Sequence, residues 1–338
     1  MSFCRPQPIE IPSMNQPSEL PLVALLGPTA SGKSTLAVWL AEHCDGEVVA
    51  CDSTQLYRGF DIGTAKPTAE ERRGVPHHLL DVLEVGEWTT AGAYRERAAT
   101  VLEDLAKRGK LPIFTVGTGL YLRALVEGLA EVPERSEELR LRLRSSAAEH
   151  PAGYLHRMLR RLDRVSAEKI EPTDQQKLIR AIEVCLLAKK PLSELHQSPR
   201  KHLQGWRVLK IGLLPERERL YERLRMRTDS MLERGWMEEV RGWIELGLSE
   251  PSKPYDFIGY RELRAVLEGK GKLAEARLAI LQATRRYAKR QFTWFRREPG
   301  VLWLAGFGEE TLIQEQALQR VKAFVHGTGL PGRNGMEV

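Results

Sequence analysis

The stretch "LLGPTASGKSTLAVWL", residues 25–40, decides how this chain begins to fold. Its segment 27–34, the phosphate loop, matches the pattern GxxxxGK[ST], in which backbone amides and a helix N-terminus surround phosphate oxygens. An apolar run at 22–26 precedes the loop, and helical periodicity follows from 34 to 44. This order of strand, glycine-rich loop and helix predicts a binding site for a diphosphate or triphosphate. Such a loop usually holds ATP or GTP, but a diphosphate on another molecule presents similar oxygens.

The side chains of the phosphate loop suit this role. Gly27 and Gly32 let the backbone wrap tightly around an anion. Lys33 is expected to neutralise the terminal phosphate, and the Ser34 hydroxyl suits a Mg²⁺ ligand.

Strand and helix patterns alternate after the loop. Strands are predicted at 47–51 and 110–116, with helices at 90–108 and from 120. Residues 134–203 are dense in Arg, Glu and Leu without a convincing strand, and a strand pattern returns at 206–215. We therefore predict an α/β fold: a P-loop NTPase-like parallel sheet core with an all-helical insertion and a helical C-terminal part. The predicted parts are a disordered leader (1–20), a core (21–132 and 205–325), a helical insertion (133–204) and a disordered tail (326–338).

Composition narrows the class of protein. The chain has 338 residues, of which 42% are hydrophobic and 28% charged, and a net charge of +6 weakly favours an anionic partner. Cys4, Cys44, Cys51 and Cys185 show neither disulfide-framework nor zinc-finger spacing, which indicates a reducing compartment. No signal peptide and no apolar run of roughly 20 residues is visible. We expect a cytoplasmic monomer that does not bind a membrane.

Two polar side chains follow predicted strands. Asp52 ends the strand in "VVACDSTQLY" and is expected beside the phosphate loop, because ligands sit at the carboxyl ends of parallel strands. It could hold Mg²⁺ through water, remove a proton from an acceptor, or simply cap a turn. Thr118, between two glycines after the third strand, could face the same pocket. The loop "FDIGTAKPT" (60–68) is either a substrate-binding loop or an ordinary surface connection.

Positive charge gathers on two helical faces. In "TRRYAKRQFTWFRRE" (284–298), a spacing of 100° per residue puts Arg286, Lys289, Arg290 and Arg297 within a third of the circle. Tyr287, Gln291, Phe292, Trp294 and Phe295 take the other side and are expected to pack inward. Arg157, Arg160, Arg161 and Arg164 form a second face opposite Leu155, Met158, Leu159, Leu162 and Val165. Solvated charged faces normally mix signs, so these faces favour a nucleic acid, and RNA over DNA because no DNA-binding motif is present.

Seven motifs in order cover nearly the whole chain except its ends. They are "GPTASGKS" (27–34), "DSTQLYRGFDIGTAKPT" (52–68), "GTGLYLRAL" (117–125), "PTDQQKLIRAIEV" (172–184), "RLRMRTDSML" (223–232), "FIGYRE" (257–262) and "RRYAKRQFTWFR" (285–296). They resemble the motifs of the tRNA dimethylallyltransferases, also called tRNA isopentenyltransferases. The resemblance implies transfer of a prenyl group from dimethylallyl diphosphate to the exocyclic amine of the tRNA adenosine just 3′ of the anticodon, with Mg²⁺ required.

The resemblance also implies roles for individual residues. Diphosphate binding falls to Gly27, Thr29, Ala30, Ser31, Gly32, Lys33 and Ser34, with Ser34 as the metal ligand; Arg223 and Arg227 are further candidates, against an ordinary ion-pair role on their helix. Asp52 is implied as the proton acceptor, and Thr118 as the residue that helps to place the adenine amine. The tRNA contacts implied are Asp52, Ser53, Thr54, Gln55, Thr118, Arg140, Gln176, Lys177, Leu178, Ile179, Arg180, Phe257, Ile258, Gly259, Tyr260 and Arg261, with Arg286, Lys289 and Arg290 clamping the anticodon stem-loop.

The sequence departs from this family in small ways. Val116-Gly117 stands where a glycine pair is common, and Lys177 where Arg is usual. No cysteines form the C-terminal zinc finger of eukaryotic relatives, so the chain resembles the bacterial type. The alternatives are a P-loop kinase or NTPase that acts on a nucleotide or RNA, a prenyltransferase acting on a free nucleotide, and an RNA-binding protein without catalysis.

Overall fold

The computed structural model describes residues 19–198, 200–247 and 253–327. Most of the predicted leader and tail therefore lies outside the described residues, although Leu20 already belongs to the first strand. The chain divides into two compact units: one holds the chain up to Leu125 and from Leu203 onward, the other Val126–His202. No helix in the described part of the chain combines the length and apolar character of a transmembrane segment.

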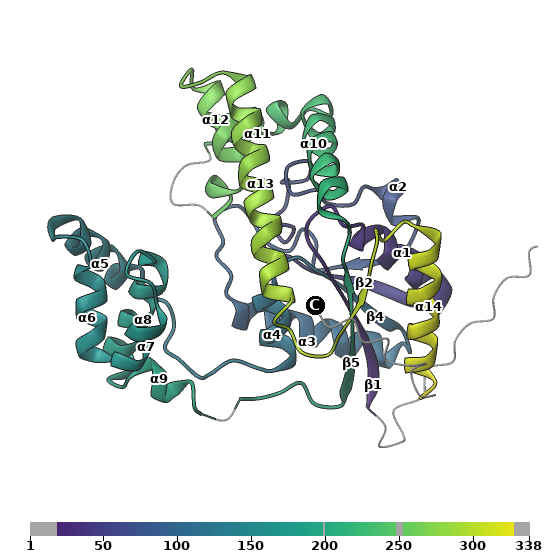
Figure 1. The fold of residues 1–338 in the computed structure, drawn as a ribbon, viewed down its shortest axis with the longest axis horizontal. Coiled ribbons are helices and arrows are strands. Elements are labelled where there is room, and N and C mark those ends of the chain that lie inside the picture. Colours follow the sequence, from purple (N-terminus) through teal and green to yellow (C-terminus); the bar gives the residue numbers. More distant parts are fainter. Residues whose placement is uncertain (1–18, 199, 248–252, 328–338) are drawn as a thin grey trace, which may run out of the picture. The chain divides into compact units, whose positions relative to one another are not determined.

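The first unit is built on a parallel sheet of six strands (Figure 1). The strands are β1 (Leu20–Leu26), β2 (Gly46–Cys51), β3 (His77–His78), β4 (Leu111–Val116), β5 (Trp206–Leu213) and β6 (Val301–Leu304). Their order is β3-β2-β4-β1-β5-β6, and every pairing is parallel. The predicted parallel α/β core is confirmed. Two strands were missed: β3 has only two residues, and β6 is a short edge strand after a long helix.

Strand order corrects one detail of the prediction. Asp52 follows β2, but β2 is not the neighbour of β1, because β4 lies between them and pairs with both. Thr118 follows β4, the strand that separates β1 from β2. All three strands still end at the same edge, where ligands bind in parallel sheets.

Helices cover both faces of the sheet. On one face, α1 (Lys33–Cys44) and α14 (Thr311–Val325) bury Leu36, Leu40 and Val321 against β-strand residues such as Val23 and Ile211. Figure 1 shows these two helices together on that side. On the other face lie α3 (Ala91–Lys107) and α4 (Gly119–Val126), whose tyrosines Tyr94 and Tyr121 stack with ring centroids 4.4 Å apart.

A buried carboxylate ties the edge of the sheet together. Glu47 on β2 accepts hydrogen bonds from both guanidinium ends of Arg108 and contacts His78 Nε2 on β3 at 2.6 Å. Hydrogen bonds from Arg108 are the largest influence on Glu47 and lower its pKa to about 2 from 4.5. Since the folded pKa lies below the unfolded value, the ionised carboxylate stabilises the fold at neutral pH.

Replacing Glu47 by glutamine is therefore expected to reduce the free energy of unfolding at pH 7 by about 2 kcal/mol. The difference between wild type and variant should shrink as the pH falls below about 4.5 and vanish near pH 2, where the folded carboxylate is protonated. Urea unfolding at several pH values measures this. Glu103→Gln, an exposed carboxylate on α3, is the matched control; equal losses in the two variants, or a loss independent of pH, would contradict the assignment.

The C-terminal part of the first unit is helical, as predicted. It contains α10 (Arg217–Glu233), α11 (Trp236–Glu245), the 3₁₀ turn η1 (Lys253–Asp256), α12 (Tyr260–Leu267) and α13 (Leu273–Phe295), and the short α2 (Ala69–Arg72) precedes β3. An aromatic cluster joins these helices to the chain after β2. Phe60 stacks on Trp243 with centroids 4.6 Å apart, and Phe257 and Tyr260 meet Phe60 edge-on or tilted.

The second unit is all helical. Its helices are α5 (Glu137–Glu149), α6 (Tyr154–Leu162), α7 (Arg164–Lys169), α8 (Gln175–Ala188) and α9 (Leu192–Leu195), around a core that includes Leu155, Leu159 and Ile182. The second basic face was predicted as one helical surface, and this is wrong. Asp163 ends α6 and caps α7, so Arg164 starts a new helix and pairs with Glu168, while Val165 is exposed.

Candidate active site

The phosphate loop connects β1 to α1. Gly27 adopts φ 149° and Gly32, at the N-cap of α1, φ 88°. A Cβ at Gly27 would lie 2.8 Å from Ser31 Oγ, and one at Gly32 would lie 2.4 Å from Glu309 Oε2, so both positions require glycine. The loop therefore has the tight backbone that the sequence predicts, and the start of α1 lines the cavity described below.

Lys33 lies within this loop. Its ammonium donates hydrogen bonds to the carbonyl oxygens of Gly27 at 2.8 Å and Pro28 at 2.9 Å. Burial lowers the Lys33 pKa to about 8; Asp52 acts in the opposite direction and Arg227 adds to the decrease. In the described part of the chain this ammonium is held by neutral carbonyls, so it is suited to bind an anion that replaces them.

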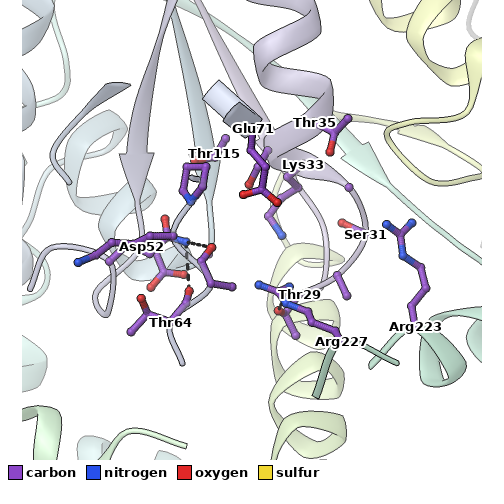
Figure 2. A pocket seen from close by; sticks show the side chains of 18 of the residues that line it. Thr29, Ser31, Lys33, Thr35, Asp52, Thr64, Glu71, Thr115, Arg223 and Arg227 are labelled. Carbon is purple, nitrogen blue, oxygen red and sulfur yellow. Dashed lines mark hydrogen bonds between the residues drawn. The ribbon is translucent and has the colours of Figure 1, made fainter. Parts of the chain in front are cut away.

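A cavity of about 690 Å³ opens in front of the loop. Figure 2 shows Asp52 and Thr64 on one side and Arg223 and Arg227 on the other, with Lys33 between them. The Arg227 guanidinium lies 3.4 Å from Thr29 Oγ1, and burial lowers its pKa to about 10, so it stays charged at neutral pH. The residues that line the cavity include the predicted residues Thr29, Ala30, Ser31, Gly32, Lys33, Ser34, Asp52, Gln55 and Arg223.

Asp52 and Thr118 each form hydrogen bonds with a residue in the chain just after β2. Asp52 Oδ1 accepts from the Thr54 amide at 2.9 Å and from the Thr54 hydroxyl at 2.8 Å. Thr118 Oγ1 accepts from the Ser53 amide at 3.0 Å and donates to Ser53 Oγ at 3.3 Å. The structure thus brings Asp52, Ser53, Thr54 and Thr118 together at the ends of β2 and β4. Burial raises the pKa of the neighbouring Cys51 thiol to about 12, so this group stays protonated.

Gly117 leaves room for the Asp52 carboxylate. A Cβ at position 117 would lie 1.9 Å from Asp52 Oδ2 and 2.8 Å from its Cγ. Position 117 thus controls where the carboxylate sits; the sequence showed a glycine on either side of Thr118 but not which group the glycine at 117 accommodates.

Replacing Gly117 by alanine is expected to push Asp52 away from its site and lower the turnover rate roughly 100-fold. Asp52 should be displaced while the rest of the unit stays folded. Single-turnover kinetics, with thermal unfolding as the check on folding, measure this. Gly86→Ala, at a glycine with open space, is the control; an active Gly117→Ala enzyme would contradict the placement of Asp52.

Gln291 on α13 joins the two ends of the cavity. Its Oε1 accepts from the Thr29 amide at 2.8 Å, and its Nε2 donates to the Gly117 carbonyl at 2.9 Å. The Tyr287 hydroxyl donates to the same carbonyl at 3.3 Å. The Thr29 amide is thus already used, which leaves its hydroxyl for a ligand. The sequence placed Gln291 on the inward face of this helix without giving it a role, and a buried amide among aromatics was the available signal.

Arg223 has a partner. It forms an ion pair with Glu309 and lies over the Phe307 ring at 4.5 Å. These two residues follow β6, in a segment that also reaches the phosphate loop, since the Gly308 amide donates to the Ser31 carbonyl at 2.9 Å. Arg223 lines the cavity, so a diphosphate would compete with Glu309 for it. Nothing in the local sequence indicated Glu309.

The loop 60–68 is part of the site. Its residues Thr64, Ala65, Lys66 and Pro67 line the cavity. Glu239 on α11 fixes the loop, because its carboxylate accepts from the amides of Asp61 at 2.9 Å and Ile62 at 2.8 Å. Gln55 Nε2 donates to the carbonyls of Thr64 and Ala65, which ties the loop to the chain after β2.

The stretch 257–261 is mostly internal. Phe257 and Tyr260 are buried in the aromatic cluster, and Gly259 packs against the Trp236 ring. Ile258 is half-buried, and Arg261 is exposed beside Glu262. The Phe257 and Tyr260 side chains support the loop 60–68, and the Tyr260 hydroxyl donates to Glu239. The tRNA contacts of this stretch stay a prediction.

Within the helical unit, some of the residues predicted to contact tRNA are buried and others are exposed. Leu178 and Ile179 lie in the core of this unit, and their tRNA contacts stay a prediction. Arg140 and Arg180 both bind the buried carboxylate of Glu183, at 2.9 and 2.7 Å. Gln176 and Lys177 are exposed, with Lys177 paired to Asp174. These charged pairs orient α5 and α8 within the unit.

Few side chains at the cavity could hold a metal ion. The described residues contain no group of three or more His, Cys, Asp or Glu that could hold a metal. Ser34 is exposed on the first turn of α1, at the cavity. One hydroxyl beside a phosphate site fits Mg²⁺, which takes most of its ligands from phosphate and water rather than from a protein cage.

Comparisons with known proteins identify the family. A sequence model described as IPP transferase matches residues 55–298. The chain is 54% identical to a tRNA dimethylallyltransferase of Koribacter versatilis, over 89% of this chain and 98% of the relative. It is similar to a solved tRNA isopentenylpyrophosphate transferase of Staphylococcus epidermidis, with 35% identity, TM-score 0.65 and coverage of 91% and 99%. A eukaryotic dimethylallyltransferase solved acting on tRNA has 25% identity and TM-score 0.78, with coverage of 93% and 81%. The chain therefore belongs to the IPP transferase family.

Proposed function

We propose that this chain is a tRNA dimethylallyltransferase. It transfers a dimethylallyl group from dimethylallyl diphosphate to the exocyclic amine of the adenosine 3′-adjacent to the anticodon in tRNA, and pyrophosphate leaves. The observation that carries this proposal is one cavity with buried cations at the phosphate loop and the Asp52 carboxylate facing them. The names of the relatives support tRNA as the acceptor.

At the donor end, the phosphate loop and its cations bind the diphosphate. Breaking the allylic carbon–oxygen bond leaves the bonding electrons, and so negative charge, on the departing pyrophosphate. Lys33 and Arg227 lie where that charge develops, and fixed cations in a water-poor site stabilise it strongly. Arg223 joins them when it exchanges Glu309 for phosphate.

At the acceptor end, Asp52 removes a proton from the adenine amine. An adenine amine is a weak nucleophile, so losing its proton as the nitrogen–carbon bond forms assists the reaction. Oδ1 is held by Thr54, and this orients the carboxylate. Thr118 holds the backbone after Asp52 and helps to place the base.

Mg²⁺, held by the Ser34 hydroxyl and by diphosphate oxygens, would supply further positive charge to the leaving group. The tRNA partner would be bound at the anticodon stem-loop by a monomer, and the adenosine must leave its stack to enter the cavity. Such an enzyme acts where tRNA is found, in the cytoplasm.

A three-acceptor experiment tests the proposal. The enzyme receives dimethylallyl diphosphate and Mg²⁺ with AMP, with an anticodon stem-loop containing three consecutive adenines, or with a control loop without them. Mass spectrometry of the nucleosides should detect a prenylated adenine only in the adenine-containing stem-loop. Modification of AMP alone would favour a free-nucleotide prenyltransferase, and ATP turnover without prenyl transfer would favour a kinase or NTPase.

A further inference from the structure

A second cavity lies outside the cavity at the phosphate loop. It measures about 550 Å³ and is formed by residues of α4 and α13 and by Arg297, two residues after the end of α13. We call it the indole groove, because the Trp294 side chain stands in it among cations: Arg123, Arg286, Lys289, Arg290 and Arg297, together with Thr293. Trp294 is 36% exposed, although its helical position suggested that it packs inward.

The absence of a side chain at Gly119 creates the seat for this ring. A Cβ at position 119 would lie 2.1 Å from Trp294 Nε1 and 2.2 Å from Cδ1. The Arg123 guanidinium lies 4.7 Å from the ring centroid. Gly119 directly follows Thr118, so the indole stands beside the acceptor end of the active site.

The α13 and post-α13 cations that line the indole groove differ from Arg277, earlier on α13, which pairs with Asp229. In the described ranges, Arg286, Lys289, Arg290 and Arg297 are exposed and have no Asp or Glu within ion-pair distance. The adjacent Glu298 is buried and bound to Lys210 at 2.7 Å and Arg123 at 3.2 Å. Most arginines on α10 are paired, as Arg219 and Arg225 show, so this surface is set apart by unneutralised charge.

An exposed indole beside the cations Arg286, Lys289, Arg290 and Arg297 matches an unpaired nucleotide. Aromatic rings stack on bases that have left a helix, while arginine and lysine bind the phosphates on either side. Duplex RNA would engage the cations but not the ring, because its bases are stacked on one another. A free nucleotide offers the same ring and phosphate chemistry, but only a strand would use cations spread from Arg286 to Arg297.

We propose that Trp294 stacks on an unpaired base of the substrate RNA, from a nucleotide close to the adenosine that enters the active site. This inference rests on the proposed function. Stacking there keeps the neighbouring nucleotide out of the RNA stack, which leaves the target adenosine free to turn toward Asp52. Arg286, Lys289 and Arg290 then hold the phosphates of this strand.

A double-mutant cycle tests the contact. Trp294→Leu should weaken binding of the adenine-containing stem-loop about 10-fold, and Trp294→Phe should retain most of the affinity. Removing the base at each loop position in turn should reveal one position near the target whose loss weakens wild-type binding by a similar factor. The same abasic change should have little further effect on Trp294→Leu. AMP binding should be equal in wild type and Trp294→Leu.

Arg290→Gln is the matched control. It should weaken RNA binding and lower the salt dependence, yet keep the full abasic penalty, because it removes a phosphate contact and not the ring. Thermal unfolding checks that each variant is folded. The stacking inference is wrong if, at every loop position, Trp294→Leu and base removal weaken RNA binding independently, so that their factors multiply. This outcome applies to an enzyme that transfers the prenyl group. Failure of the proposed function would appear differently, as a wild-type enzyme that prenylates no stem-loop.

Discussion

Replacing Asp52 by asparagine is expected to lower the single-turnover rate of prenyl transfer about 10²–10⁴-fold, with a much smaller change in affinity for the RNA. Asparagine keeps an Oδ1 that can accept the two hydrogen bonds from Thr54, so the side chain should stay in place. What it loses is the negative charge and the ability to take the amine proton. The rate should be measured near pH 7, where Lys33 is charged, because Asp52 also raises the Lys33 pKa.

A second carboxylate at the same cavity provides the control. Glu71 on α2 is exposed, and its carboxylate accepts a hydrogen bond from the Thr68 amide at 2.8 Å. Glu71→Gln changes the cavity charge by the same amount, but at a different place, and should cost far less rate. Equal losses in the two variants would show that Asp52 acts through its contribution to the total charge of the cavity and not through its position. Comparable losses of rate and RNA affinity in Asp52→Asn would make it a positioning residue.

Replacing Lys33 by methionine is expected to have the second largest effect, a loss of about 10²–10³-fold in kcat/KM for the donor. The ammonium faces the phosphate site from within the loop, and no other side chain of the loop carries a charge. Arg227 remains and should preserve residual binding. Initial rates over a range of dimethylallyl diphosphate concentrations separate the change in kcat from the change in KM.

The same lysine predicts a pH dependence. With a pKa of about 8, the free enzyme loses this charge as the pH rises through 8, so donor binding should weaken above that pH and stay constant below it. Lys33→Met should abolish this dependence, whereas Lys289→Met, outside the cavity, should keep it and weaken RNA binding. A wild-type donor affinity that does not change between pH 7 and 9 would contradict the assignment.

Local sequence was enough to predict the phosphate loop, Asp52 and Thr118. Each lies within a few residues of a buried strand, and the ends of parallel strands converge on one edge of the sheet. The insertion of β4 between β1 and β2 could not be read in the same way, because strand order depends on how distant segments pack. Arg227, Gln291 and Glu309 reach the loop from helices and turns about 200 or more residues further along the chain.

The sequence also does not show which charged side chains are buried and paired. Arg140 and Arg180 look like surface cations, yet both are used by Glu183, a carboxylate buried on an otherwise apolar face. The basic face of α13 was predicted correctly, because its cations have no acidic neighbours within the helix. Trp294 was assigned to the wrong side of that helix. It lies at the border of the two faces, and the space left by Gly119 on α4 decides its direction.

The most direct test is a crystal structure of the enzyme with an anticodon stem-loop and a donor analogue in which sulfur replaces the bridging oxygen. Both phosphorus atoms should lie at the phosphate loop, with the Lys33 ammonium turned from the Gly27 and Pro28 carbonyls to phosphate. The adenine amine should lie about 3 Å from a carboxylate oxygen of Asp52. A diphosphate bound elsewhere, or an adenine amine out of reach of Asp52, would contradict the account.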